Sequence, residues 1–189
     1  MIRIGILGDI GSGKSYVAKN FGYPVFNADY EVRKLYQSSK KIFNKLKKSL
    51  PKYISSFPVD KKEITSAILS DKKNLTKIIK IVHLEIRKKL NTFIKKNKKS
   101  KILILDIPLL LENKINNKKY ILIFVESKKL EIIKRLKKRK NFNHKLLKKF
   151  KNIQLPIIYK KKESHFIIKN DFTKRTVRNR IKNILKKII

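Results

Sequence analysis

Residues 8–15 carry the strongest chemical signal in this sequence. They are GDIGSGKS, which fits glycine, four residues, glycine, lysine and then serine or threonine. Glycines let backbone N–H groups curve around one anion and leave no side chain in its way. Lys14 can then reach the terminal phosphates, and Ser15 can offer a hydroxyl to Mg²⁺. The pattern predicts a loop that binds the phosphates of a nucleotide, with a strand before it and a helix after it.

One acid stands inside this loop. The carboxylate of Asp9 would repel bound phosphates if it pointed toward them. Only backbone donors are needed at that position of a phosphate loop. Asp9 is therefore compatible with phosphate binding if its side chain points outward, and we assign it no catalytic role.

Three carboxylates further along the chain suit phosphoryl transfer. Asp106 follows the apolar run 102–105, where an acid can help to hold Mg²⁺ through water, although a plain strand-end acid is the alternative. Asp29 follows a second short strand and could orient or deprotonate an acceptor hydroxyl; a helix N-cap is its alternative. Glu112 follows the apolar segment 108–111 and could equally be a loop acid.

Arginine is rare here, with eight residues against 43 lysines among the 51 basic residues, so each one merits attention. Arg33 lies one helical turn after Asp29, and Arg87 lies one turn after His83, so each pair shares a helix face. These side chains could bind an anionic acceptor. An ordinary surface position is the alternative for each arginine.

A basic segment in the last third of the chain could close over a nucleotide. Arg135 and Arg139 flank residues 140–151, which are rich in lysine. Mobile segments of this kind exclude water from kinase sites. A surface role is again the alternative for both arginines.

Short apolar runs alternate with helical patterns along the chain. Strands are predicted at 2–7, 23–27, 102–105, 121–125 and 166–168. Helices are predicted at 16–21, 28–50, 61–69, 72–96, 128–139 and 173–188, with Asp60 and Asp71 as N-caps. This alternation favours an α/β fold with a parallel sheet. The stretch 28–96 carries few strand signals, so we expect it to be an insertion beside the sheet.

Composition narrows the class of protein. A chain of 189 residues with 41% hydrophobic residues can build one compact domain. We find no run of 18 apolar residues and no secretory signal, so we expect no membrane association. Cysteine is absent, which excludes disulfides, thiolate chemistry and cysteine-based zinc sites. The three histidines, His83, His144 and His165, are too scattered to indicate a metal site.

The formal net charge of +38 raises the possibility of nucleic-acid binding. Specific nucleic-acid surfaces favour arginine, whose planar fork binds phosphate and guanine in bidentate fashion. Here the excess is lysine spread over many helices, which is typical of a solvated surface. We therefore expect no specific nucleic-acid partner, and a basic nucleic-acid-binding protein remains the less favoured alternative.

Other classes of nucleotide-binding protein fit less well. A GTPase would need a base-binding motif of the N-K-x-D type, and the sequence has none. The chain is too short for a typical helicase or transporter ATPase. Small-molecule kinases remain.

Six ordered blocks resemble the dephospho-CoA kinase family along nearly the whole chain. Besides residues 8–15, they are NAD at 27–29 with Arg33, HLEIR at 83–87, DIPLLLE at 106–112, QLP at 154–156 and IKN at 168–170. The family commonly has glycine at position 9, aspartate at position 27 and proline at position 84, where this chain has Asp9, Asn27 and Leu84. An arginine expected near Phe150 is also missing.

The resemblance implies a three-layer P-loop kinase fold with five parallel strands. The nucleotide-binding core would comprise residues 1–27, 100–137 and 157–189. Residues 28–99 would form a helical acceptor-binding region, and residues 138–156 a lid.

The resemblance also implies a reaction, the last step of CoA biosynthesis. The γ-phosphoryl group of ATP would pass to the 3′-hydroxyl of dephospho-CoA with Mg²⁺ present, in a cytoplasmic monomer or weak homo-oligomer. Another nucleotide kinase remains the alternative. The implied catalytic residues are Lys14, Asp29 and Arg139, and Mg²⁺ would bind at Ser15 and Asp106. ATP would bind at Gly8, Gly11, Ser12, Gly13, Lys14, Ser15, Tyr16 and Asn170. The acceptor would bind at Asp29, Arg33, His83, Arg87, Pro108, Leu109 and Glu112.

Overall fold

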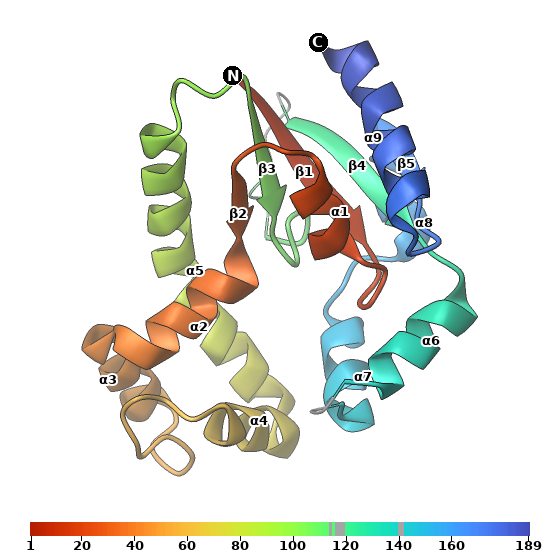
Figure 1. Cartoon of the computed structure of the whole chain (residues 1–189). Helices are drawn as coiled ribbons and strands as arrows, with labels where there is room; N and C mark the ends of the chain where they lie inside the picture. Colours follow the sequence, from red (N-terminus) through yellow and green to blue (C-terminus); the bar gives the residue numbers. More distant parts are fainter. Residues whose placement is uncertain (114, 116–119, 140–141) are drawn as a thin grey trace. The chain divides into compact units, whose positions relative to one another are not determined.

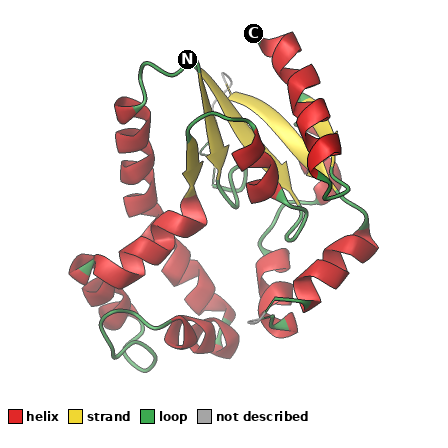
Figure 2. Ribbon diagram, viewed as in Figure 1, coloured by secondary structure: helices red, strands yellow, loops and turns green. Residues whose placement is uncertain are grey.

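The computed structural model describes residues 1–113, 115, 120–139 and 142–189 and contains a parallel sheet (Figures 1 and 2). Within these residues the sheet has five strands in the order β2-β3-β1-β4-β5, and all four pairings are parallel. The predicted α/β class and five parallel strands are confirmed. The strands are β1 Ile2–Gly8, β2 Val25–Asn27, β3 Ile102–Asp106, β4 Tyr120–Glu126 and β5 Phe166–Lys169.

The chain divides into two compact units. The first comprises Met1–Asn27, Asn97–Phe142 and Gln154–Ile189, and the second comprises Ala28–Lys96 and Asn143–Ile153. The three predicted regions remain predictions. Residues 114 and 116–119 of the predicted core and residues 140–141 of the predicted lid lie outside the described residues.

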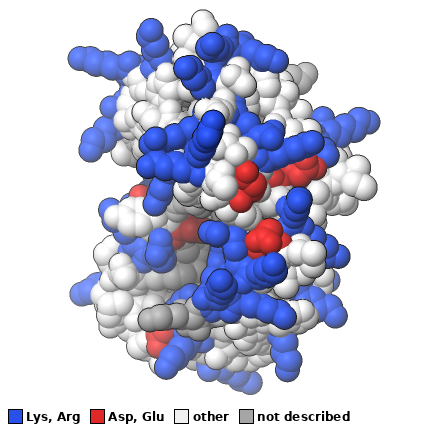
Figure 3. Space-filling view, turned by 45° about the vertical axis from the view of Figure 1, so that its right-hand side comes forward, with Lys and Arg blue, Asp and Glu red and all other residues white. Residues whose placement is uncertain are grey.

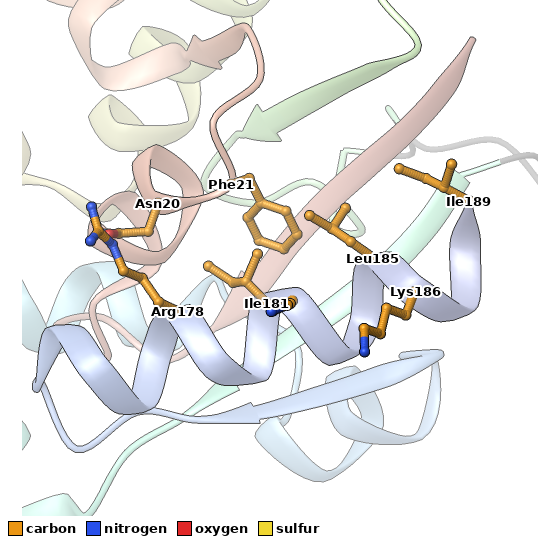
Figure 4. Close-up of a pocket in the computed structure, with 8 residues that line it drawn as sticks. Asn20, Phe21, Arg178, Ile181, Leu185, Lys186 and Ile189 are labelled. Atoms are coloured by element: carbon orange, nitrogen blue, oxygen red, sulfur yellow. The ribbon is translucent and has the colours of Figure 1, made fainter.

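Three helices of the first unit pack on the sheet, because its strands are apolar on both faces. All five residues of β3 are buried, as are the last five of β1. Val17, Ala18 and Phe21 pack with the apolar face of the last helix into one core. Figure 4 shows Phe21 beside Ile181 and Leu185 of that helix. The helices of this unit are α1 Lys14–Asn20, α6 Lys129–Lys137, α8 Ile157–Lys162 and α9 Lys174–Ile188.

The second unit is helical in all its described elements. The single helix predicted over 28–50 is wrong, because Ser39 separates two helices and its hydroxyl accepts the Ile42 N–H at 3.3 Å as an N-cap. The predicted caps are confirmed: Asp60 accepts the Lys62 N–H, and Asp71 accepts the Lys73 N–H, both at 2.8 Å. The helices are α2 Ala28–Ser38, α3 Lys40–Ser49, α4 Lys61–Ser70, α5 Lys72–Lys96 and α7 His144–Asn152.

The basic segment after α6 is partly helical. Asn143 caps α7 by accepting the Leu146 N–H at 2.9 Å, and Lys149 donates to the Leu69 carbonyl at 2.9 Å, which joins α7 to α4. Across the described ranges, we find no helix with the length and apolar character that a membrane crossing requires.

Candidate active site

The phosphate loop connects β1 to α1 in the first unit. Gly8, Gly11 and Gly13 have φ angles of 147°, 88° and 90°, a region that side chains disfavour. A Cβ at Gly8 would lie 2.7 Å from both the Ser12 hydroxyl and the Val125 carbonyl. Gly13 is the N-cap of α1, which begins two residues earlier than predicted. Lys14 and Ser15 therefore occupy the first turn of the helix.

The Lys14 side chain folds back over the loop. Its ammonium donates to the Gly8 carbonyl at 3.1 Å and to the Asp9 carbonyl at 2.8 Å. The loop thus holds a positive charge beside its own backbone, as an anion-binding loop requires.

The Asp9 carboxylate contacts the loop itself. Its Oδ1 accepts the N–H of Ile10 at 2.7 Å. One backbone donor of the loop is therefore engaged by a negatively charged side chain. No sequence pattern predicts this contact.

Asn170 supports the loop from the far end of the sequence. It is 3% exposed, its amide donates to the Ser12 carbonyl at 2.8 Å, and its Oδ1 accepts the Phe172 N–H at 2.9 Å. Ser127 donates to the same Ser12 carbonyl at 2.9 Å. A Cβ at Gly13 would overlap the Asn170 amide. Asn170 thus holds the loop in place, and its predicted contact with ATP remains a prediction.

One aromatic ring and one guanidinium lie near the Gly13 end of the loop. The guanidinium of Arg135 lies 4.1 Å from the centre of the Phe172 ring, a cation–π distance. A Cβ at Gly13 would lie 3.0 Å from the same ring. Neither Phe172 nor Ser127 was predicted as a site residue, because no motif includes them.

Asp106 ends β3 at the carboxyl edge of the sheet, the edge at which parallel α/β sheets bind ligands. It is 3% exposed and pairs in register with Asn27 of β2. The Asn27 amide donates to its Oδ2 at 2.5 Å. The site therefore has a buried carboxylate with a fixed orientation on the strand next to β1.

The residues present fit a nucleotide phosphate with Mg²⁺. The Ser12 hydroxyl is buried without a hydrogen-bond partner among the described residues, and a phosphate oxygen would supply one. The Ser15 hydroxyl and the Asp106 carboxylate are the oxygen donors that Mg²⁺ prefers. No group of three or more acidic, histidine or cysteine side chains gathers in the described ranges. Mg²⁺ needs no such cage, because it usually binds through one or two carboxylates and substrate phosphates.

Glu112 lies in the turns that follow β3, beyond Pro108 and Leu109. Its Oε1 accepts the Lys160 ammonium at 2.7 Å and the Leu155 N–H at 3.0 Å. Leu109 has a positive φ of 59°, so the chain turns sharply at this point. The contacts of Glu112 are thus with groups of the protein.

The second unit holds the other predicted site residues. Asp29 is exposed in the first turn of α2, so it does not precede the helix as an N-cap would. Arg33, also on α2, is exposed, with its guanidinium 5.9 Å from the Tyr30 ring. Glu31 pairs with Lys89 at 3.2 Å, which links α2 to α5.

His83 and Arg87 lie one turn apart on α5. Burial lowers the pKa of the His83 imidazole below its usual value, and the positive charge of Arg87 lowers it further. His83 is therefore neutral near pH 7. Its Nε2 is buried and has no hydrogen-bond partner among the described residues.

The structure gathers the predicted residues in two groups. The first unit holds the phosphate loop with Asn170 and Asp106, and also exposed Arg139 just beyond α6. The second unit holds Asp29 and Arg33 on α2 and His83 and Arg87 on α5, two helices that pack together.

Comparisons with known proteins agree with the motif blocks. A dephospho-CoA kinase of Wolbachia pipientis is 34% identical over 187 residues, which cover 96% of this chain and 95% of that protein. A crystal structure of a Thermus thermophilus protein has a TM-score of 0.80 and 25% identity, and the match covers 100% of this chain and 98% of that one.

A dephospho-CoA kinase structure from Campylobacter jejuni shares the fold, with a TM-score of 0.60 and 22% identity over 98% of this chain and 96% of that one. The family model described as dephospho-CoA kinase matches residues 2–175. The resemblance seen in the motif blocks is thereby confirmed, and this chain belongs to the dephospho-CoA kinase family of ATP-dependent kinases.

Proposed function

We propose that this protein transfers the γ-phosphoryl group of ATP to the 3′-hydroxyl of dephospho-CoA, giving CoA and ADP. Membership of the dephospho-CoA kinase family supports the choice of dephospho-CoA as the acceptor. The observation that carries the phosphoryl transfer is the phosphate loop, where the Lys14 ammonium lies 2.8 Å from the Asp9 carbonyl and 3.1 Å from that of Gly8. We place the reaction in the cytoplasm, in a monomer or weak homo-oligomer.

Charge stabilisation is assigned to the loop. Phosphoryl transfer depends on positioning and on groups that neutralise the terminal phosphate oxygens. In this proposal Lys14 leaves its two carbonyl partners for the β- and γ-phosphates, and the loop amides bind the remaining oxygens. Ser15 and Asp106 would hold Mg²⁺, which neutralises phosphate charge when bound. Tyr16 lies next to these residues in α1 and completes the proposed ATP-binding set.

Acceptor activation is assigned to the second unit. Asp29 would orient or deprotonate the attacking hydroxyl. Arg33 and Arg87 would bind the acceptor's phosphates, since guanidinium groups pair with phosphate in bidentate fashion. Neutral His83 would add a hydrogen bond without a charge. Pro108 and Leu109 would contact the acceptor from the turn after β3, and Arg139 would stabilise the transferring group.

The test is ADP release from the purified protein with Mg-ATP, with and without dephospho-CoA. We expect release to depend on dephospho-CoA and to collapse in Asp29→Asn, which preserves the shape of the side chain and removes its charge. Asp60→Asn is the matched control, because Asp60 only caps α4. A folded, ATP-binding protein that ignores dephospho-CoA would overturn the acceptor assignment, and a screen of nucleotide acceptors would then identify another small-molecule kinase.

Nucleic-acid binding remains the less favoured second function. The basic side chains in Figure 3 are spread over the whole visible face and do not form one stripe. Such a surface attracts any polyanion at low salt. Binding of DNA or RNA that is lost at physiological salt would reflect this surface alone, whereas sequence-selective binding at that salt would support the second function.

A further inference from the structure

Lys160 is a buried cation that the proposed mechanism does not use. It is 4% exposed, and it is the only lysine or arginine that is buried among the residues the structure describes. Its neighbours on α8, Lys161 and Lys162, are exposed. An ammonium removed from water is strongly destabilising unless a carboxylate and further acceptors surround it. The groups that surround the Lys160 ammonium therefore determine whether its burial is tolerated.

The partner of Lys160 is Glu112, at 2.7 Å, with side chains 5% and 10% exposed. The same carboxylate oxygen accepts the Leu155 N–H at 3.0 Å, and the ammonium also donates to the Gln154 side-chain oxygen at 3.2 Å. These four residues form a closed network, which we name the Glu112 clamp. All four belong to the first unit.

The Glu112 clamp connects the turns that follow Asp106 with the chain segment that begins at Gln154. Glu112 follows Asp106 by six residues, through the turns that contain Leu109. Gln154 is the first residue after 143–153, the segment that folds with the second unit. The clamp therefore fixes the turns beyond β3 against the point at which the chain returns to the sheet.

We infer that Glu112 is a positioning residue and not a direct ligand of the acceptor. Its carboxylate orients Leu155 and Gln154 and neutralises Lys160, and it thereby holds the turns after β3 in the shape that the acceptor requires. The inference deepens the proposed function and rests on it only for the acceptor's identity. Only resemblance assigns Glu112 to the acceptor, whereas its Oε1 is engaged by both Lys160 and the Leu155 N–H and its side chain is 10% exposed.

The test is a cycle of three variants: Glu112→Gln, Lys160→Met and the double variant. Glutamine can still accept the Leu155 N–H, but it leaves the Lys160 ammonium without its countercharge. We expect Glu112→Gln to lower Tm by roughly 10 °C and to raise the KM for dephospho-CoA about 10-fold. The double variant has no buried charge left, so both values should return most of the way to those of the native protein.

A direct ligand would behave differently. If Glu112 binds the acceptor, the double variant keeps the raised KM although its Tm recovers, and Lys160→Met alone leaves the KM native. Either result, or a Glu112→Gln variant with native Tm and KM, overturns the inference. Lys161→Met is the matched control: Lys161 is the next residue on α8, its ion pair with Glu126 of β4 is much more exposed, and the change should leave both values unchanged.

Hydrogen exchange of backbone amides tests the Glu112 clamp without the acceptor substrate. We expect the backbone amide of Leu155 to exchange its hydrogen at least 10-fold faster in Glu112→Ala than in the native protein, because alanine has no side-chain oxygen to accept its hydrogen bond. Unchanged exchange would contradict the clamp. Because this measurement uses the protein without substrates, failure of the clamp is distinguished from failure of the dephospho-CoA assignment.

Discussion

Asn27 and Asp106 are register partners at the carboxyl ends of β2 and β3, and the Asn27 amide donates to Asp106 Oδ2 at 2.5 Å. An aspartate at position 27, which the motif resemblance leads us to expect there, would place two carboxylates side by side. Here a neutral donor faces the buried acid, so the hydrogen bond fixes one carboxylate oxygen without charge repulsion. Asn27 is thus suited to orient Asp106 toward a metal ion.

Asn27→Ala should therefore raise the Mg²⁺ concentration needed for half-maximal activity, by about 10-fold, because Asp106 loses the donor that orients it. The measurement is ADP release as a function of Mg²⁺ at saturating ATP. Asn20→Ala is the control, since its amide donates to the Tyr16 carbonyl of its own helix. Lower activity with an unchanged Mg²⁺ requirement would show that Asn27 supports only the strand.

Lys14→Ala should reduce kcat by about 10²-fold or more, because the transition state loses its nearest cation. Thermal stability should change little, since Lys14 is only partly buried and donates to carbonyls of the loop. Lys19→Ala, on an exposed position of the same helix, should keep native turnover. Near-native kcat in Lys14→Ala would refute the assignment of the phosphate loop.

Asp9→Gly should tighten ATP binding about 5-fold, which corresponds to one hydrogen bond of modest strength. The change removes a negative charge from the loop and releases the Ile10 N–H that its carboxylate engages. Asp9→Asn separates these two effects, because the amide oxygen can still accept that N–H. Calorimetric titration with a non-hydrolysable ATP analogue measures the affinity, and an equal affinity in all three proteins would show that Asp9 has no influence on the phosphates.

The sequence predicts most of the first unit because its signals are local. Residues 8–15 combine glycines whose positive φ angles the structure requires, and the apolar run 102–105 becomes a fully buried strand. The break at Ser39 was missed because neither glycine nor proline stands there; the cap is a single side-chain hydrogen bond to Ile42.

Local sequence patterns do not predict contacts between distant parts of the chain. Asn170 bonds to Ser12 across 158 positions of the sequence, and no spacing rule connects them. Lys160 lies in a run of three lysines, which is typical of a solvated surface, yet it is buried against Glu112. Only the packing of α8 against the sheet shows which lysine of the three is buried.

His83 offers a pH-dependent test of the second unit. Because burial and Arg87 lower its pKa, the unfolded chain takes up a proton more readily than the folded protein as pH falls below the ordinary value of 6.5. The contribution of His83 to stability is thus fully present above pH 6.5 and is lost as pH falls through the lowered pKa. NMR titration of the imidazole should give a midpoint below 6.5.

Arg87→Gln should raise that midpoint, because it removes the charge, but not as far as 6.5, because burial is the larger cause. Lys95→Gln removes the same charge from an exposed position of α5 that is about three turns away from His83, and it should leave the midpoint unchanged. If both variants raise it equally, the net charge of the helix and not the neighbouring guanidinium controls His83. A midpoint at or above 6.5 in the native protein would contradict the lowering of the His83 pKa by burial and Arg87.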